Sequence, residues 1–308
     1  MENIKTTSAF MTIVGRPNVG KSSFMNAVLG CKVAIVSEKP QTTRTRIMGV
    51  YNKDEAQLVY IDTPGFHKPG TELGKIMIKA VNSGLTEVDG VTMIVDAAPG
   101  FKYDYDNPPA AELALIKEIG QKKLKAVLGI NKIDLLVKKD ELLKIIMMYS
   151  RLYDFEAVVP FSAKTGDNID VLVQEQLKFC KPSVHYFPPD EITDQPERVM
   201  AAEIIREKLL RLLSKEVPHG IAIDVEKFVE NDTKDGPMVN IEAVIYCEKD
   251  SHKGIIIGKS GSMLKRVGSY ARQDLEDFFG IQCCVKLWVK VKENWRNRAG
   301  LIHSFGLD

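Results

Sequence analysis

A phosphate-binding loop constrains this sequence more than any other feature. The stretch GRPNVGKS, residues 15–22, matches the pattern G-x-x-x-x-G-K-[ST] and follows an apolar run over residues 9–14. In this pattern the glycines let backbone N–H groups turn towards a bound phosphate, Lys21 neutralises the β- and γ-phosphate oxygens, and Ser22 offers its hydroxyl to Mg²⁺. The helix expected over residues 21–29 points its positive end at the same place. The sequence therefore predicts a nucleoside-phosphate site.

A second motif selects the base. The sequence Asn131-Lys132-Ile133-Asp134 stands at the end of the apolar run over residues 126–130. The carboxylate of Asp134 can accept two hydrogen bonds from guanine, one from the ring N–H and one from the exocyclic amine. Adenine offers neither in that arrangement, and a site that strands a buried polar group rejects a ligand by roughly 10⁴-fold or more. The motif therefore predicts GTP or GDP as the nucleotide.

Two further strand ends carry polar residues with different predicted roles. Ser162-Ala163-Lys164 follows the apolar run over residues 157–161, and we expect the Ala163 N–H to meet the guanine oxygen while Lys164 flanks the ring. Asp96 ends another buried run. We expect it to form a turn rather than to act as a catalytic acid.

The residues predicted to hold Mg²⁺ and sense the γ-phosphate lie between these motifs. Asp62-Thr63-Pro64-Gly65 directly follows the apolar run over residues 58–61. A carboxylate in this position can hold Mg²⁺ through a water, and the N–H of Gly65 can contact the γ-phosphate. Upstream, a threonine of the polar stretch QTTR, residues 41–44, could complete the Mg²⁺ shell when the γ-phosphate is bound. Of the two threonines we predict Thr43 rather than Thr42.

Together these motifs make the sequence similar to the translation-factor-related GTPases, in the group that includes the Era, tRNA-modification and Der families. The NVGKS form of the loop, the TTR stretch and an apolar residue after DTPG carry this resemblance. The apolar residue, Phe66, stands where Ras-like enzymes carry the glutamine that orients the attacking water. The resemblance implies that another group assists hydrolysis. In relatives with an asparagine at the place of Asn18, a bound K⁺ can supply charge to the phosphates, although Asn18 could also serve only to shape the turn.

Length and composition indicate an ordinary globular chain. At 308 residues and 44% apolar content, it is long enough for about two domains of roughly 150 residues each. No apolar run approaches the roughly 18 residues that a membrane-spanning helix needs, and the first residues lack a basic segment leading into an apolar core, so we expect a cytoplasmic protein. Five cysteines without a C-x-x-C pair suggest neither a disulfide framework nor a zinc site.

The order of apolar runs predicts the architecture. Over residues 1–180 these runs alternate with helical patterns, which is typical of an α/β GTPase domain with a doubly wound, mostly parallel sheet and ligands at the carboxyl ends of its strands. Prolines cluster over residues 181–196, which we interpret as a linker. Residues 197–308 then form a smaller α+β domain. Its first helix opens with Asp194 and Glu197 at the spacing of a capping box.

The C-terminal domain contains a glycine-rich turn of a different kind. Its GKS sequence, residues 258–260, is not a second phosphate loop, because only three residues separate Gly254 from the next glycine where the pattern needs four. The stretch IIGKSG matches instead the GXXG loop of a KH domain, and the predicted element order resembles the type II arrangement, in which four single-stranded nucleotides lie in the adjoining groove. Between residues 249 and 298, 11 basic residues stand against five acidic ones, which favours nucleic acid near this loop. Trp288 and Trp295 could stack on RNA bases, or one could be buried and the other exposed.

A GTPase domain followed by one KH domain narrows the resemblance to the Era family of ribosome-assembly GTPases. The resemblance implies a molecular switch that binds GTP, engages the 3′ region of small-subunit ribosomal RNA, helps the small ribosomal subunit mature, and releases after hydrolysis. It implies Mg²⁺ as cofactor with K⁺ as a candidate second cation, and a monomer in the cytoplasm that could associate peripherally with the inner face of the cell membrane. The sequence is also compatible with a non-enzymatic RNA-binding adaptor in which the nucleotide only stabilises the fold. The presence of Lys21, Ser22 and Asp62 argues against this alternative.

The predicted site residues follow from these motifs. The nucleotide site comprises Gly15, Arg16, Pro17, Asn18, Val19, Gly20, Lys21, Ser22, Ser23, Asp62, Thr63, Pro64, Gly65, Asn131, Lys132, Asp134, Ser162, Ala163 and Lys164. Catalysis is assigned to Lys21, Thr43, Asp62 and Gly65, and metal binding to Ser22, Thr43 and Asp62. The predicted RNA contacts are Gly258, Lys259, Ser260, Gly261, Lys265 and Arg266.

Overall fold

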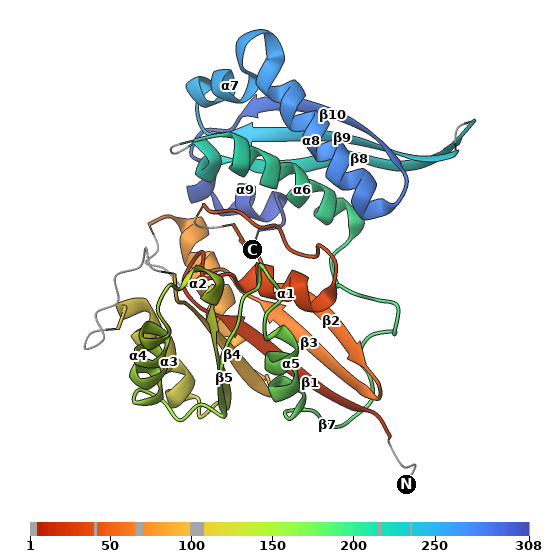
Figure 1. Ribbon diagram of the computed structural model, residues 1–308. Helices are drawn as coiled ribbons and strands as arrows, with labels where there is room; N and C mark the ends of the chain where they lie inside the picture. Colours follow the sequence, from red (N-terminus) through yellow and green to blue (C-terminus); the bar gives the residue numbers. More distant parts are fainter. Residues whose placement is uncertain are drawn as a thin grey trace. The chain divides into compact units, whose positions relative to one another are not determined.

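Two compact units make up the chain, which a computed structural model describes over residues 5–39, 42–65, 70–98, 108–214, 217–234 and 236–307 (Figure 1). The first unit comprises Met1–Ala34, Thr43–Lys68 and Met77–Asp194. The second comprises Ile35–Thr42, Pro69–Ile76 and Gln195–Asp308. Gln41 and Phe66, both named above, lie outside the described residues.

The first unit contains a twisted sheet with the strand order β2-β3-β1-β4-β5-β6. Its strands are β1 (Thr7–Val14), β2 (Ile47–Lys53), β3 (Ala56–Asp62), β4 (Gly90–Asp96), β5 (Ala126–Asn131) and β6 (Ala157–Pro160). The strands from β3 to β6 are parallel to their neighbours, whereas β2 forms an antiparallel hairpin with β3. Because β1 has β3 on one side and β4 on the other, a crevice forms at its carboxyl end, where such sheets bind their ligands.

Helices cover both faces of this sheet, so its central strands are buried almost throughout. One core joins α1 (Lys21–Leu29) and α5 (Ile169–Leu177) to the sheet. A second core packs α3 (Ala110–Gln121), α4 (Lys139–Ser150) and the end of α2 (Glu72–Gly84) on the other face. These helices alternate with the strands along the chain, as the apolar patterns predict. Within the described ranges, no helix is both long and apolar enough to cross a bilayer.

Most of the stretch predicted as a linker, residues 181–196, is built into the first unit. β7 (Lys181–Pro182) pairs antiparallel with β1, and the N–H groups of Tyr186 and Phe187 donate to the buried Gln57 side chain at 2.8 and 3.1 Å. The predicted capping box does not form, because Pro196 is the N-cap residue of the helix and there is no side-chain cap hydrogen bond; Asp194 Oδ1 accepts from the Met48 N–H at 3.0 Å. The following helix begins after Pro196 without a side-chain cap.

The second unit is a three-stranded sheet with helices packed on one face. β8 (Ala222–Thr233) and β9 (Gly236–Cys247) form an antiparallel hairpin, and β10 (Gln282–Val291) runs parallel to β9. The long helices α6 (Glu197–Leu212) and α8 (Ser262–Phe279) close the core over the sheet, as Figure 1 shows. The short helices α7 (Asp250–Ile257) and α9 (Ala299–Ser304) complete the unit. From α6 to β10 the order is helix, strand, strand, helix, glycine-rich turn, helix, strand, which is the order that the apolar patterns predict for this domain.

The second unit also includes residues 35–42, although the sequence places them within the GTPase domain. The N–H of Val36 donates to the fully buried carboxylate of Glu207 on α6 at 3.0 Å. The guanidinium of Arg206, also buried, donates to the carbonyl of Thr42. Charged side chains on α6 therefore satisfy the hydrogen bonds of backbone groups in residues 35–42. The polar sequence of this segment does not predict these contacts.

Candidate functional site

The phosphate loop lies between β1 and α1 at the crevice of the first unit. Its backbone is left-handed at Asn18, with φ 65°, and at Gly20, with φ 99°. The buried Lys21 ammonium donates to the carbonyls of Gly15 at 3.2 Å and Arg16 at 3.1 Å. Burial lowers the pKa of Lys21 from 10.5 to about 8, and the Asp62 carboxylate partly opposes this shift. The loop thus holds a cation at the position where the motif places the phosphates.

The three residues predicted to bind metal converge beside Lys21. Ser22 Oγ lies 2.7 Å from Asp62 Oδ2 and 3.0 Å from Thr43 Oγ1, and Thr43 Oγ1 lies 3.3 Å from the same carboxylate oxygen. The other oxygen, Asp62 Oδ1, is buried and has no hydrogen-bond partner. Burial raises the pKa of Asp62, against the nearby Lys21 ammonium. Thr42, the alternative, donates instead to the carbonyl of Lys39 at 2.7 Å.

This oxygen set fits Mg²⁺. Hard divalent cations prefer carboxylate and hydroxyl oxygens, and the orphaned Asp62 Oδ1 is an acceptor that a cation or its water would satisfy. Ser22, Thr43 and Asp62 are therefore the residues that would hold the ion. When bound, Mg²⁺ neutralises charge on the β- and γ-phosphate oxygens.

The remaining residues around the γ-phosphate position pack tightly. A Cβ on Gly65 would come within 2.8 Å of Pro17 Cα, so this glycine allows the DTPG turn to touch the phosphate loop. Thr63 turns its hydroxyl away, donating to the Ile13 carbonyl at 2.8 Å. Ser23 is half-buried in the first turn of α1. The predicted role of Phe66 concerns a residue outside the described ranges.

Asn131 joins the base-recognition motifs to the phosphate loop. Its Nδ2 donates to the Val19 carbonyl at 2.8 Å, and its Oδ1 accepts from the N–H groups of Lys132 and Ala163 at 2.8 and 2.9 Å. The Ala163 N–H, which the sequence predicts to meet the guanine oxygen, is thus engaged by Asn131 here. One amide side chain fixes three loops, which places them ready for a purine ring.

Asp134 stands exposed at the mouth of the site. Its Oδ1 accepts from Ser162 Oγ at 2.6 Å, and Ser162 Oγ also accepts from the Thr165 N–H at 3.2 Å. The hydroxyl therefore orients the carboxylate that is predicted to read guanine. Lys164 is exposed beside it.

Asp96 has a role in this site that sequence reasoning missed. Its Oδ1 accepts from the Ala98 N–H at 2.7 Å, which makes the predicted turn. Its Oδ2 also accepts from Lys132 Nζ at 2.6 Å, while the same ammonium donates to the Asn18 carbonyl at 2.8 Å. Asp96 thus positions Lys132 across the phosphate loop. Its place at the end of β4, next to β5, was the available signal.

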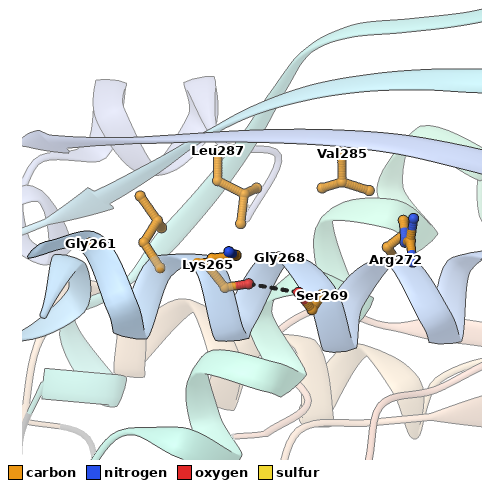
Figure 2. Close-up of a pocket in the computed structure, with 8 residues that line it drawn as sticks. Gly261, Lys265, Gly268, Ser269, Arg272, Val285 and Leu287 are labelled. Atoms are coloured by element: carbon orange, nitrogen blue, oxygen red, sulfur yellow. Dashed lines mark hydrogen bonds between the residues drawn. The ribbon is translucent and has the colours of Figure 1, made fainter.

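In the second unit, the glycine-rich turn opens onto a groove of about 530 Å³ between α8 and β10 (Figure 2). Gly258, Ser260 and Gly261 have positive φ values of 72°, 51° and 78°, which lets α7 and α8 meet at a tight turn. The groove is lined by Gly261, Leu264, Lys265, Gly268, Ser269, Arg272, Val285 and Leu287. An apolar floor with cationic side chains along one edge suits bases and phosphates respectively.

The groove differs from the predicted RNA contacts in several residues. Lys265 lines it, but Arg266 does not; the Arg266 guanidinium lies 5.6 Å from the centre of the Tyr270 ring. Arg272 and Gly268 were missed, although their helical spacing after Gly261 could have indicated them. Trp295 is buried and Trp288 is 44% exposed. Strand alternation places Trp288 on the face of β10 opposite to Val285 and Leu287, so it does not line this groove.

The fold and the two sites define a guanine-nucleotide-binding P-loop protein with a C-terminal KH domain. A family model described as 50S ribosome-binding GTPase matches residues 10–132, and a KH domain model matches residues 216–296. The chain is 48% identical to GTPase Era of Clostridioides difficile (strain 630), covering 97% of this chain and 98% of that protein. It is 46% identical to GTPase Era of Ruminiclostridium cellulolyticum, covering 97% of each.

Solved structures agree along nearly the whole chain. A crystal structure of Era in complex with MgGDPNP and nucleotides 1506–1542 of 16S ribosomal RNA matches with a TM-score of 0.90 at 36% identity, covering 98% of this chain and 99% of that one. A variant of Aquifex aeolicus Era bound to GDP and AlF4⁻ matches equally, at 37% identity. The chain belongs to the Era family and is a GTPase. The predicted resemblance, the α/β GTPase fold and the KH domain are confirmed.

Proposed function

We propose that this protein is a GTP-dependent switch that binds the 3′ region of small-subunit ribosomal RNA and assists maturation of the small ribosomal subunit. The observation that carries the RNA assignment is the groove beside the GXXG turn, in which an apolar floor adjoins Lys265 and Arg272. A second hollow of about 1130 Å³ shares Arg272 and Val285 with it and continues to Gln282. The narrow, partly apolar groove beside the GXXG turn supports a single-stranded ligand rather than a duplex. The related Era crystallised with 16S ribosomal RNA supports the choice of RNA.

The hydrogen bonds of two consecutive residues, Thr42 and Thr43, support the proposal of a GTP-dependent switch. Thr43 places its hydroxyl by Ser22 and Asp62 in the first unit. The carbonyl of the preceding residue, Thr42, accepts from Arg206 on α6 in the second unit. A change at Thr43 that accompanies loss of the γ-phosphate would therefore pull on backbone held by α6. Intact catalytic groups disfavour the alternative of an adaptor in which nucleotide is only structural.

The RNA assignment is tested with the full chain carrying Lys259→Asp and Ser260→Asp. Fluorescence anisotropy with a labelled single-stranded RNA copying the 3′ end of the small-subunit ribosomal RNA should show binding weakened by about tenfold at 0.1 M salt and a shallower salt dependence, because a phosphate contact is lost. GTP affinity should stay unchanged. The matched control is Lys227→Asp with Thr233→Asp, which makes the same charge change elsewhere in the second unit. RNA affinity that is equal in both variants would move the binding site away from the GXXG turn.

We further propose that K⁺ assists hydrolysis and that Mg²⁺ is required. Asn18, the residue of the loop associated with K⁺ in relatives, has left-handed backbone and its carbonyl is held by Lys132, which supports a fixed loop beside the phosphates. GTP turnover measured in matched K⁺ and Na⁺ buffers should be several-fold faster in K⁺. Equal rates would assign Asn18 to shaping the turn alone.

We also propose that the protein acts as a monomer in the cytoplasm and can associate peripherally with an anionic membrane surface. The supporting feature is an exposed patch at the start and outer face of α4. Its apolar members are Leu135, Val137, Leu143 and Met147, and Val137 is 88% exposed. Lys138, Lys139 and Lys144 belong to the same stretch of sequence, together with the acidic Asp140 and Glu141 of the first turn of α4. Apolar side chains among lysines are typical of surfaces that bind anionic lipid, so Leu143→Glu should reduce sedimentation with phosphatidylglycerol vesicles; unchanged sedimentation would exclude this patch.

A further inference from the structure

A buried carboxylate outside the nucleotide motifs holds the side chain of the phosphate loop's second residue. Glu112 on α3 is fully buried, and its Oε1 accepts from Arg16 Nε at 2.5 Å. Its Oε2 accepts from the hydroxyl of Tyr149, which is also fully buried on α4. Figure 1 shows α3 and α4 side by side. The loop is thereby tied to both helices of this face of the sheet.

The backbone of Arg16 has a direct part in placing Lys21. Its carbonyl and that of Gly15 are the two acceptors of the Lys21 ammonium. A shift of Arg16 would therefore move the cation that the phosphates meet. Contacts fix the rest of the loop as well, since Asn131 holds Val19 and Lys132 holds Asn18. Glu112 supplies the corresponding restraint at the start of the loop.

A contribution to stability alone does not explain why Glu112 and Arg16 are paired. Burying an ion pair adds little stability compared with well-packed apolar side chains of similar volume. What such a pair provides is a fixed geometry, because a carboxylate between a guanidinium and a phenol leaves little rotational freedom. Loops organised before the ligand arrives bind more tightly, since less ordering is left to the binding step.

We infer that Glu112 is a positioning residue for nucleotide binding, acting through Arg16 and oriented by Tyr149. The inference rests on the assignment of Lys21 to the phosphate site. Because the restraint exists before nucleotide binds, its loss weakens the binding of GTP and of GDP alike.

The test uses the full chain with Glu112→Gln, and nucleotide affinity is measured by titration with fluorescent GTP and GDP analogues. The dissociation constants for both nucleotides should rise about tenfold and by the same factor. Glu118→Gln, which removes a half-buried carboxylate of the same helix that pairs with Lys122 at 4.0 Å, should change neither dissociation constant. Tyr149→Phe, which removes only a hydroxyl, should raise both dissociation constants about threefold and serves where Glu112→Gln does not fold.

A double variant separates positioning from stability. If Glu112 acts through Arg16, Glu112→Gln should cause no further loss of affinity in an Arg16→Met background. Additive losses, or a lowered melting temperature with unchanged affinity, would overturn the inference. Lys21→Ala should abolish binding in the same assay. Retained binding there would overturn the site assignment instead, so the two failures are distinguishable.

Discussion

The nucleotide-free protein should become more stable as the pH rises through the range in which Lys21 loses its proton. Burial lowers the pKa of Lys21 from 10.5 to about 8, so the folded state disfavours the charged ammonium. The free-energy cost of burying the charged ammonium is fully present below about pH 8. It disappears as the pH rises to about 10.5, where Lys21 of the unfolded chain also deprotonates. A shift of about 2.5 units corresponds to about 3 kcal/mol of lost folding free energy at neutral pH. At pH 9.5 about 1.4 kcal/mol of this cost remains.

Comparison with Lys21→Met isolates this effect. Between pH 7 and 9.5 the stability of the wild type should rise by about 2 kcal/mol relative to the variant, because the titrations of groups that do not interact with Lys21 cancel in the difference. The assay is urea unfolding of both proteins without nucleotide or Mg²⁺. The transition of the first unit is identified as the one that MgGDP shifts in the wild type.

A wild-type minus variant difference that stays constant from pH 7 to 9.5 would refute the reasoning. It would mean that the ammonium is solvated in the nucleotide-free loop. The expected result has a functional meaning, because the loop holds a cation at a cost in stability that a bound phosphate would offset.

Three further outcomes follow from the same contacts. Asp134→Asn should weaken GTP binding at least about 100-fold and admit xanthine nucleotides, whose ring oxygen suits an amide donor; unchanged GTP affinity in a titration would exclude Asp134 as the guanine reader. Asp96→Asn removes the charge opposite Lys132 and should raise the dissociation constants of GTP and GDP about threefold, whereas Glu175→Gln, which breaks a surface pair, should leave them unchanged. Gln176→Leu breaks buried hydrogen bonds with Tyr60 and Thr92 and should destabilise the first unit by about 1–3 kcal/mol in urea unfolding; a neutral result would mean that the leucine repacks there.

Sequence reasoning reached the nucleotide site because its motifs are short and stand at strand ends. The carboxyl ends of parallel strands meet at one edge of a sheet, so Lys21, Asp62 and Asn131 had to come together once the strand order was known. No sequence pattern distinguished Thr43 from Thr42 as the predicted Mg²⁺ ligand. The structure places the Thr43 hydroxyl beside Ser22 and Asp62. The sequence did not predict the roles of Asp96 and Glu112, because each depends on a partner far away in the chain, Lys132 for Asp96 and Arg16 for Glu112.

The second domain shows the same division. The GXXG turn and the element order indicated a KH domain from local pattern alone. The groove lining did not follow fully, since Val285 and Leu287 reach it from a strand that only the packed sheet brings opposite α8. The predicted cap at Asp194 is wrong, because the helix begins two residues later than the capping-box spacing places it, with Pro196 as its N-cap residue.

By itself, then, the sequence determined the class of fold, the nucleotide and the kind of nucleic-acid module, because glycine spacing, apolar period and motif order are local properties of a chain. Only the tertiary structure decided which side chains orient those motifs. Residues 35–42 join the second unit through Glu207 and Arg206, and Arg16 is held by Glu112. A buried charge needs a partner because packing excludes water from it. Which residue becomes that partner depends on the packing and cannot be read from the distance between the two residues in the sequence.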